Sequence, residues 1–192
     1  MSQSDAEKWD AIYSAGKHLR NEPVKVLQDY AHLLPTTGTA LDVACGSGSN
    51  ALFLARHGLK ASAWDISEQA INLLNEKASQ MHINIETRVC DIVKKPPDEN
   101  SFDIIVVSYF LDRVLFPALV KALKNNGLLF YQTFSIERTN NTGPSNDNYR
   151  LARNELLELC HDLKIILYHE EGLVGNTQKG LRNEVMLIGQ RL

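Results

Sequence analysis

The chain has 192 residues, of which 44% are hydrophobic and 22% charged, and its formal net charge is −3. This balance suits one globular domain with a substantial core, and it argues against nucleic acid or an anionic membrane as the partner. No run approaches about 18 apolar residues and the first residues show no signal-peptide pattern, so we expect no membrane span and a cytoplasmic protein.

Two amphipathic helices are predicted first. Trp9, Ile12 and Tyr13 share one face of a helix over residues 5–20 that Gly16 should end. An apolar stripe predicts a second helix over 22–34, which the turn residues that follow should stop.

Strands and helices then alternate along the chain. Short apolar runs predict strands at 39–44, 60–64, 83–89, 102–108 and 127–133. Helical periodicity between them predicts helices at 49–57, 68–80 and 112–124, the last one kinked near Pro117. Residues 94–101 should be a turn-rich loop. This rhythm indicates an α/β fold with a parallel sheet whose ligand site lies at the carboxyl ends of the strands.

The last third of the chain changes in character. Residues 135–148 are polar, and a loop of this length inside a domain is usually functional or disordered. A helix at 152–160 and strands at about 163–170 and 183–190 should follow, with a second loop at 172–180 between the strands.

The most informative stretch is the turn after the first strand. Gly46 and Gly48 remove side chains where a backbone approaches a ligand, and the next helix directs unpaired N–H groups at that ligand. Asp65 closes the second strand, where a carboxylate can accept hydrogen bonds from ribose hydroxyls. Asp42 lies inside the first strand and would repel a pyrophosphate, whereas a ligand with a sulfonium or ammonium group would gain from it.

The string from Asp42 to Gly48 resembles the first motif of the class I S-adenosylmethionine-dependent methyltransferases, D-x-G-x-G-x-G, with Ala44 in place of the first glycine. The similarity is greatest to the small single-domain group that includes the tellurite-resistance and thiopurine methyltransferases. It covers roughly residues 9–190 and is strongest over 40–134.

The resemblance implies a Rossmann-like, doubly wound sheet of seven strands in the order 3-2-1-4-5-7-6, with strand seven antiparallel. We expect residues 1–192 to be a single methyltransferase domain. Its parts would be an N-terminal helical cap (1–35), a cofactor-binding core (39–134) and a C-terminal part with the lid loop, a helix and a hairpin (135–192).

The resemblance also implies S-adenosyl-L-methionine as cofactor and S-adenosyl-L-homocysteine as product. Asp42 would help fix the methionine end, Asp65 would bind the ribose and Asp91 would accept from the adenine amino group. The residues that we expect to line the cofactor are Trp9, Asp42, Ala44, Cys45, Gly46, Gly48, Asn50, Asp65, Ile66, Asp91, Ile92 and Ser108. Structural alternatives remain: Asp42, Asp65 and Asp91 as turn or cap residues, and Trp9 as a residue that docks the first helix.

Tyr109, Tyr13 and Arg113 are the candidates for the methyl-transfer site, and no metal ligand set is evident. Tyr109 ends the fourth strand, although it could equally be a core aromatic residue. Arg113, like Arg138, Arg150 and Arg153, could offer charge to an anionic acceptor. His18 could line the same lid as Tyr13, or be an exposed histidine.

No general base is obvious, which favours acceptors that arrive deprotonated, such as a thiol or a chalcogen oxyanion like tellurite. The motif of adenine methyltransferases is absent after the fourth strand, which favours a small-molecule substrate. Two alternatives stay open: a nicotinamide-dependent oxidoreductase, which Gly46, Gly48 and Asp65 would also fit, and a non-catalytic S-adenosylmethionine-binding module. The sequence leaves the oligomeric state open.

Overall fold

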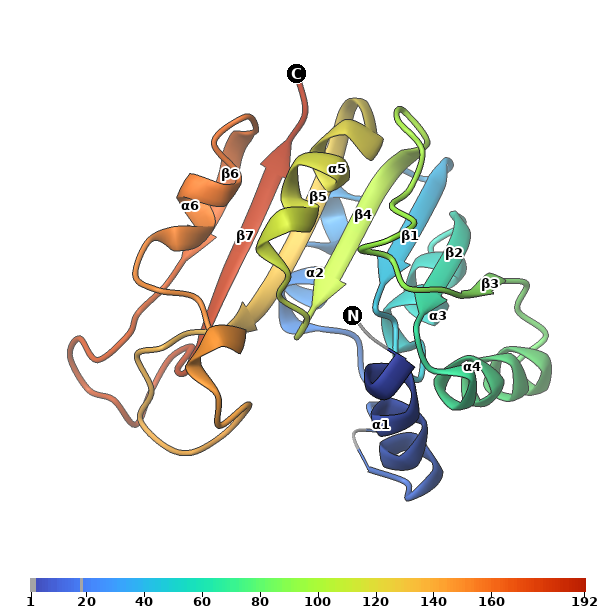
Figure 1. The fold of residues 1–192 in the computed structure, drawn as a ribbon. Helices are drawn as coiled ribbons and strands as arrows, with labels where there is room; N and C mark the ends of the chain where they lie inside the picture. The colour runs from blue at the N-terminus through green and yellow to red at the C-terminus, as the bar shows by residue number, and fades with distance from the viewer. Residues whose placement is uncertain (1–2, 18) are drawn as a thin grey trace.

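The computed structural model describes residues 3–17 and 19–192 and shows one seven-stranded sheet in the order β3-β2-β1-β4-β5-β7-β6 (Figure 1). Its strands are β1 (Thr39–Val43), β2 (Lys60–Asp65), β3 (Glu86–Val89), β4 (Phe102–Ser108), β5 (Leu123–Phe134), β6 (Lys164–His169) and β7 (Glu184–Gln190). β1 to β5 are parallel, and β7 pairs antiparallel with both β5 and β6. The α/β class and the strand order implied by the resemblance are confirmed.

Helices cover both faces of this sheet. They are α1 (Gln3–Ser14), α2 (Lys25–Asp29), α3 (Ser49–Arg56), α4 (Glu68–Gln80), α5 (Phe116–Ala122) and α6 (Glu155–Leu159), with 3-10 turns at Ala31–Leu33, Arg113–Leu115 and Asp147–Tyr149. Figure 1 shows α5 and α6 on one face and α2 on the other, while α1 lies beyond the carboxyl ends of the parallel strands. None of these helices is long and apolar enough to cross a membrane, counting the residues that the structure describes.

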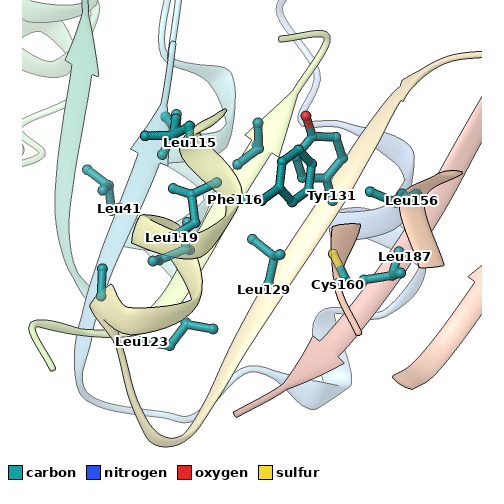
Figure 2. Close-up of a cluster of buried hydrophobic side chains, with 14 of the residues drawn as sticks. Leu41, Leu115, Phe116, Leu119, Leu123, Leu129, Tyr131, Leu156, Cys160 and Leu187 are labelled. Carbon is teal, nitrogen blue, oxygen red and sulfur yellow. The ribbon is translucent and has the colours of Figure 1, made fainter. Parts of the chain in front are cut away.

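The largest part of the core lies between the sheet and the helices α5 and α6 (Figure 2). Phe116 from α5 stacks on Tyr131 from β5, with 5.0 Å between the ring centroids, and both rings are almost fully buried. Leu156 and Cys160 reach the same cluster from α6. β4 is largely buried, and so is β5 from Gly127 to Thr133, which is why these stretches are mostly apolar.

The predicted helix over 68–80 has the observed bounds of α4, and Ser67 caps it by accepting from the amide of Ala70 at 3.1 Å. Other boundaries are shorter than predicted. α1 ends at Ser14, since Gly16 turns left-handed with φ 67°. Residues 22–34 give only α2 and a 3-10 turn. α5 begins at Phe116 with Pro117 in its first turn, because proline fits the first turn of a helix better than its middle.

Candidate functional site

The turn between β1 and α3 adopts a conformation that its glycines permit. Ala44, Gly46 and Gly48 all have positive φ angles, 51°, 53° and 79°. A Cβ atom on Gly46 would lie 2.4 Å from the Tyr13 hydroxyl, and one on Gly48 would lie 2.2 Å from Leu74. Both glycines are therefore required by close approach as well as by backbone angle. Ala44, at the position where the motif usually has glycine, adopts the left-handed angle at a cost.

Asp65 is held at the tip of β2 by backbone donors. The amide of Gly46 donates to Oδ2 at 2.8 Å and the amide of Ser67 donates to Oδ1 at 2.9 Å. The carboxyl group is 7% exposed, and burial raises its pKa above the ordinary range although the amide donors oppose that rise. Each oxygen keeps a lone pair for a further donor, so the group can accept from two neighbouring hydroxyls.

Asp42 connects the first strand to the start of α3. Its Oδ2 accepts from the amide of Ala51 at 3.1 Å, and its Oδ1 accepts from the side chain of Asn50 at 3.2 Å. Burial raises the pKa of Asp42 to about 7, with Asp65 adding to the rise. Asn50 also donates to Ser108 at 2.9 Å. Asp42 thus acts on the turn through α3 and Asn50, which is the cap-acceptor alternative considered from the sequence.

Two buried carboxylic acids therefore flank one glycine turn, and among the described residues neither is paired with a basic side chain. Burial is the main cause of their raised pKa values, because it disfavours the charged form of each carboxyl group. A pyrophosphate would add negative charge next to them, whereas a sulfonium or ammonium group would offset theirs. The two carboxyl groups, with the free acceptor positions of Asp65, therefore fit the cofactor that the sequence motif implies, S-adenosylmethionine.

Helix α1 covers the glycine turn (Figure 1). Asp10 anchors it to the start of α4, because its carboxylate accepts from Ser67 Oγ at 2.6 Å and from the amide of Gln69 at 3.1 Å. Trp9 and Tyr13 lie on the same helix with ring centroids 6.1 Å apart. Since the Tyr13 hydroxyl lies against Gly46, a ligand that rests on this glycine has to displace that side chain. Burial, then Asp65, raises the pKa of Tyr13, so the phenol stays protonated.

The remaining predicted cofactor residues occupy the ends of the same strands. Cys45 follows the turn residue Ala44, and burial raises the pKa of its thiol, which makes it a poor nucleophile. Asp91 follows β3 and pairs with Lys94 at 3.3 Å. Partial burial pulls the pKa of Asp91 upward, but the bond to Lys94 helps hold it below its ordinary value. Ile66 is half-buried, whereas Ile92 is 2% exposed and belongs to the main core.

Tyr109 lies at the end of β4 in a strained conformation. Its φ angle of 53° is unusual for a bulky residue and is typical of functional sites. The phenol donates to Glu184 Oε2 at 3.1 Å, and the ring lies 5.0 Å from that of Phe134. Burial, then Glu184, raises the pKa of Tyr109 to about 12. The side chain is therefore held in place by these contacts, and its phenol is protonated at neutral pH.

Arg113 is bound by residues of the C-terminal part of the chain. It pairs with Glu155 through two nitrogens at 2.5 and 3.0 Å and donates to the backbone carbonyls of Asn148 and Arg150. The three other arginines considered with it also have partners. Arg138 pairs with Asp147, Arg153 pairs with Glu137 and the buried Arg150 donates to three carbonyls. His18 lies outside the described residues.

Four residues of this region carried no sequence signal that we used: Asp10, Arg20, Gln132 and Glu184. Gln132 accepts from the amide of Val26 at 2.8 Å and donates to Glu184 at 2.5 Å. These contacts join residues 52 to 106 positions apart in the chain. A polar residue within the apolar run of β5 was the available signal for Gln132, since buried polar side chains need partners.

Residues 40–127 match the family described as "Methyltransferase domain". A probable S-adenosyl-L-methionine-dependent methyltransferase, TehB, of Haemophilus influenzae is 32% identical over 136 residues, which are 68% of this chain and 47% of that protein. A ubiquinone biosynthesis O-methyltransferase of Coxiella burnetii is 34% identical over 100 residues, 50% of this chain and 43% of that protein. The chain spans about half the length of these curated relatives or less.

Solved structures agree on the fold. The crystal structure of TehB from Haemophilus influenzae superposes with a TM-score of 0.72 at 23% identity and covers 96% of this chain and 67% of that one. The [4+2]-cyclase SpnF superposes with a TM-score of 0.76 at 15% identity over 100% of this chain and 96% of that one. The fold alone therefore does not define one reaction.

The chain belongs to the class I S-adenosylmethionine-dependent methyltransferases, as the domain match, the sequence relatives and the strand order together show. Within that class it is similar to TehB of Haemophilus influenzae.

Proposed function

We propose that this protein binds S-adenosylmethionine and transfers its methyl group to a small-molecule acceptor, a thiol or a chalcogen oxyanion such as tellurite. The observation that carries the proposal is the pair of buried carboxyl groups, Asp42 and Asp65, on either side of the glycine turn without a basic partner among the described residues. Such a site favours a ligand with positive charge and a ribose.

The positions of the residues at the strand ends and in the glycine turn suggest which of them would hold the cofactor. Asp65 would accept from the ribose hydroxyls, and Asp91 from the adenine amino group. The turn at Gly46 and Gly48 would support the methionine portion, with Asp42 keeping that turn and the start of α3 in place. When bound, S-adenosylmethionine supplies a methyl group activated by a positively charged sulfur.

The protein's own part would be to position the acceptor and exclude water, and we assign these tasks to Tyr109 and the loop at 135–148. Raised pKa values keep Tyr13, Tyr109 and Cys45 protonated at neutral pH, so none of them serves as a ready base. This supports acceptors that are already anionic. In this proposal Arg113 acts by fixing residues 148–150 rather than by touching the acceptor.

We further propose that the partners are small molecules rather than nucleic acid or membranes, and that the protein acts in the cytoplasm. The net charge of −3 supports the first point. The three cysteines are free thiols, as is usual in a reducing compartment.

The test is calorimetric titration of the purified protein with S-adenosylhomocysteine, with NADH as the control ligand. We expect micromolar binding of the first and none of the second. Release of S-adenosylhomocysteine from S-adenosylmethionine is then measured with 2-mercaptoethanol, 2-mercaptoethanesulfonate and tellurite as acceptors. Binding of NADH, or of neither ligand, would refute the proposal, and binding without turnover of any acceptor would favour the non-catalytic module.

A further inference from the structure

The guanidinium group of Arg20 lies on the ring of Tyr109. The guanidinium carbon of Arg20 is 3.6 Å from the centroid of the Tyr109 ring, which is cation–π distance, and the side chain is otherwise exposed. An arginine over a ring face keeps N–H donors at its edge for a further partner. The contact joins the segment before α2 to the end of β4.

The backbone of Arg20 is fixed to the glycine turn. Its amide donates to Ser47 Oγ at 3.4 Å, and its carbonyl accepts from the hydroxyls of Ser47 and Ser49 at 3.2 and 3.3 Å. Farther along the segment, the amide of Val24 donates to Asn50 at 2.9 Å. Arg20 is therefore placed by the same residues that build the cofactor turn.

The platform under the guanidinium is equally fixed. Tyr109 is held by its hydrogen bond to Glu184 and by its contact with Phe134, and Gln132 braces Glu184 at 2.5 Å. Arg20 exerts an electrostatic effect on both tyrosines of the site, since it lowers the pKa of Tyr13 and of Tyr109 against their net rise. The cation thus lies on the Tyr109 ring, which follows the end of β4.

Arg20 differs from the other arginines on this side of the molecule. Arg113, Arg138 and Arg153 each form an ion pair with a carboxylate. Arg150 is buried, and its guanidinium donates hydrogen bonds to three backbone carbonyls. Arg20 forms no ion pair with any carboxylate of residues 3–17 and 19–192, so its charge is available to a ligand.

We propose that Arg20 is the specificity-determining residue for the charge of the methyl acceptor: it binds an anionic group of that acceptor, with Tyr109 as its platform. This inference rests on the proposed function. Next to a sulfonium, a second cation is unfavourable unless the acceptor is negative. With tellurite, a lone pair of the anion forms the bond to the methyl carbon while the carbon–sulfur pair returns to sulfur, so one negative and one positive charge cancel and no proton is released. With a thiol such as 2-mercaptoethanesulfonate, Arg20 would bind the sulfonate, the thiol proton passes to solvent, and the resulting thiolate forms the bond to carbon while the carbon–sulfur pair returns to sulfur.

The experiment measures anion binding separately from cofactor binding. Wild-type protein and the variants Arg20→Gln, Arg20→Lys and Arg56→Gln are saturated with S-adenosylhomocysteine and titrated calorimetrically with tellurite, 2-mercaptoethanesulfonate and the neutral 2-mercaptoethanol. Arg56 is the matched control, because it is an exposed arginine that contacts Met81 at the far end of α3. Thermal melting of each variant checks the fold.

We expect the wild type to bind at least one anionic probe in preference to the neutral thiol. Arg20→Gln should weaken that binding about tenfold or more, as for the loss of a charge-assisted hydrogen bond. Arg20→Lys should be intermediate, and Arg56→Gln unchanged. S-adenosylhomocysteine should bind all four proteins within about twofold.

Three results would overturn the inference: equal anion affinity in Arg20→Gln, a preference for the neutral thiol, or no binding of either anion by the wild type. If S-adenosylhomocysteine fails to bind the wild type, the proposed function itself is refuted. If it binds while Arg20→Gln leaves anion binding unchanged, only the role of Arg20 is refuted.

Discussion

Replacing Asp65 by asparagine is the sharpest test of the cofactor site. The carboxylate accepts one backbone amide on each oxygen, from Gly46 at 2.8 Å and from Ser67 at 2.9 Å, and has one free lone pair on each for a ribose hydroxyl. An asparagine keeps the size of the side chain but removes the charge and one acceptor. A hydrogen bond to a charged group contributes about 1.5–3 kcal/mol, so we expect S-adenosylhomocysteine to bind about 10- to 150-fold more weakly.

The cost to stability can be measured separately from the cost to binding. The asparagine NH₂ group would face either the Gly46 or the Ser67 amide, which costs about 1–3 kcal/mol. α4 should keep its start, because Ser67 Oγ still accepts from Ala70. Calorimetric titration gives the affinity, and urea unfolding without ligand gives the stability.

Asp103→Asn is the matched control for this prediction. Asp103 also accepts a backbone amide, that of Thr39 at 2.7 Å, and a bond from Lys124 at 2.9 Å, but it lies at the amino end of β4. We expect it to lose stability and keep its affinity for S-adenosylhomocysteine. An affinity of Asp65→Asn within twofold of the wild type would show that the carboxylate does not bind the ribose.

Three further predictions concern stability. Burial raises the pKa of Asp42 from 3.8 to about 7, so its contribution to stability is present in full below pH 4 and is lost as pH rises toward 7, by at most about 4 kcal/mol. Urea unfolding at several pH values measures this dependence, and Asp42→Asn should flatten it. An unchanged slope would contradict the assignment. Arg150→Gln should leave buried carbonyls unpaired and lower the free energy of unfolding by about 3–5 kcal/mol. Limited proteolysis should then cleave residues 135–149. A loop that resists cleavage would show that other contacts hold it. Ala44→Gly should raise thermal stability by about 1 kcal/mol, since glycine adopts φ 51° without strain, and a lower melting temperature would exclude strain at this position.

The elements around the glycine turn, from β1 to α4, were predictable because their sequence signals are local. A buried strand, a glycine turn and a helix cap each occupy a few consecutive residues, and α4 with its Ser67 cap followed from sequence alone. The helices near the N-terminus were less predictable. The apolar stripe over 22–34 does pack against the core, but only Lys25–Asp29 of it form the helix α2. The rest of the stripe has extended or 3-10 backbone.

The region around Tyr109 depends on contacts between distant segments. Tyr109 meets Glu184 across 75 residues, and no periodicity links the two positions. Charge alone was also misleading, because Arg113 and Arg150 are bound within the chain whereas Arg20, in a segment without a motif, has its charge available. Whether an arginine is bound within the protein depends on which groups the fold brings next to it, so composition could not predict which arginine stays available to a ligand.

Arg150 has a thermodynamic consequence for ligand binding. Its guanidinium donates to the carbonyls of Ser135, Thr142 and Pro144, so the long polar loop is held together from within. A loop already ordered does not lose its conformational entropy when an acceptor arrives. Acceptor binding should therefore show a small change in heat capacity, as expected for a preorganised site and not for a segment that folds around its ligand.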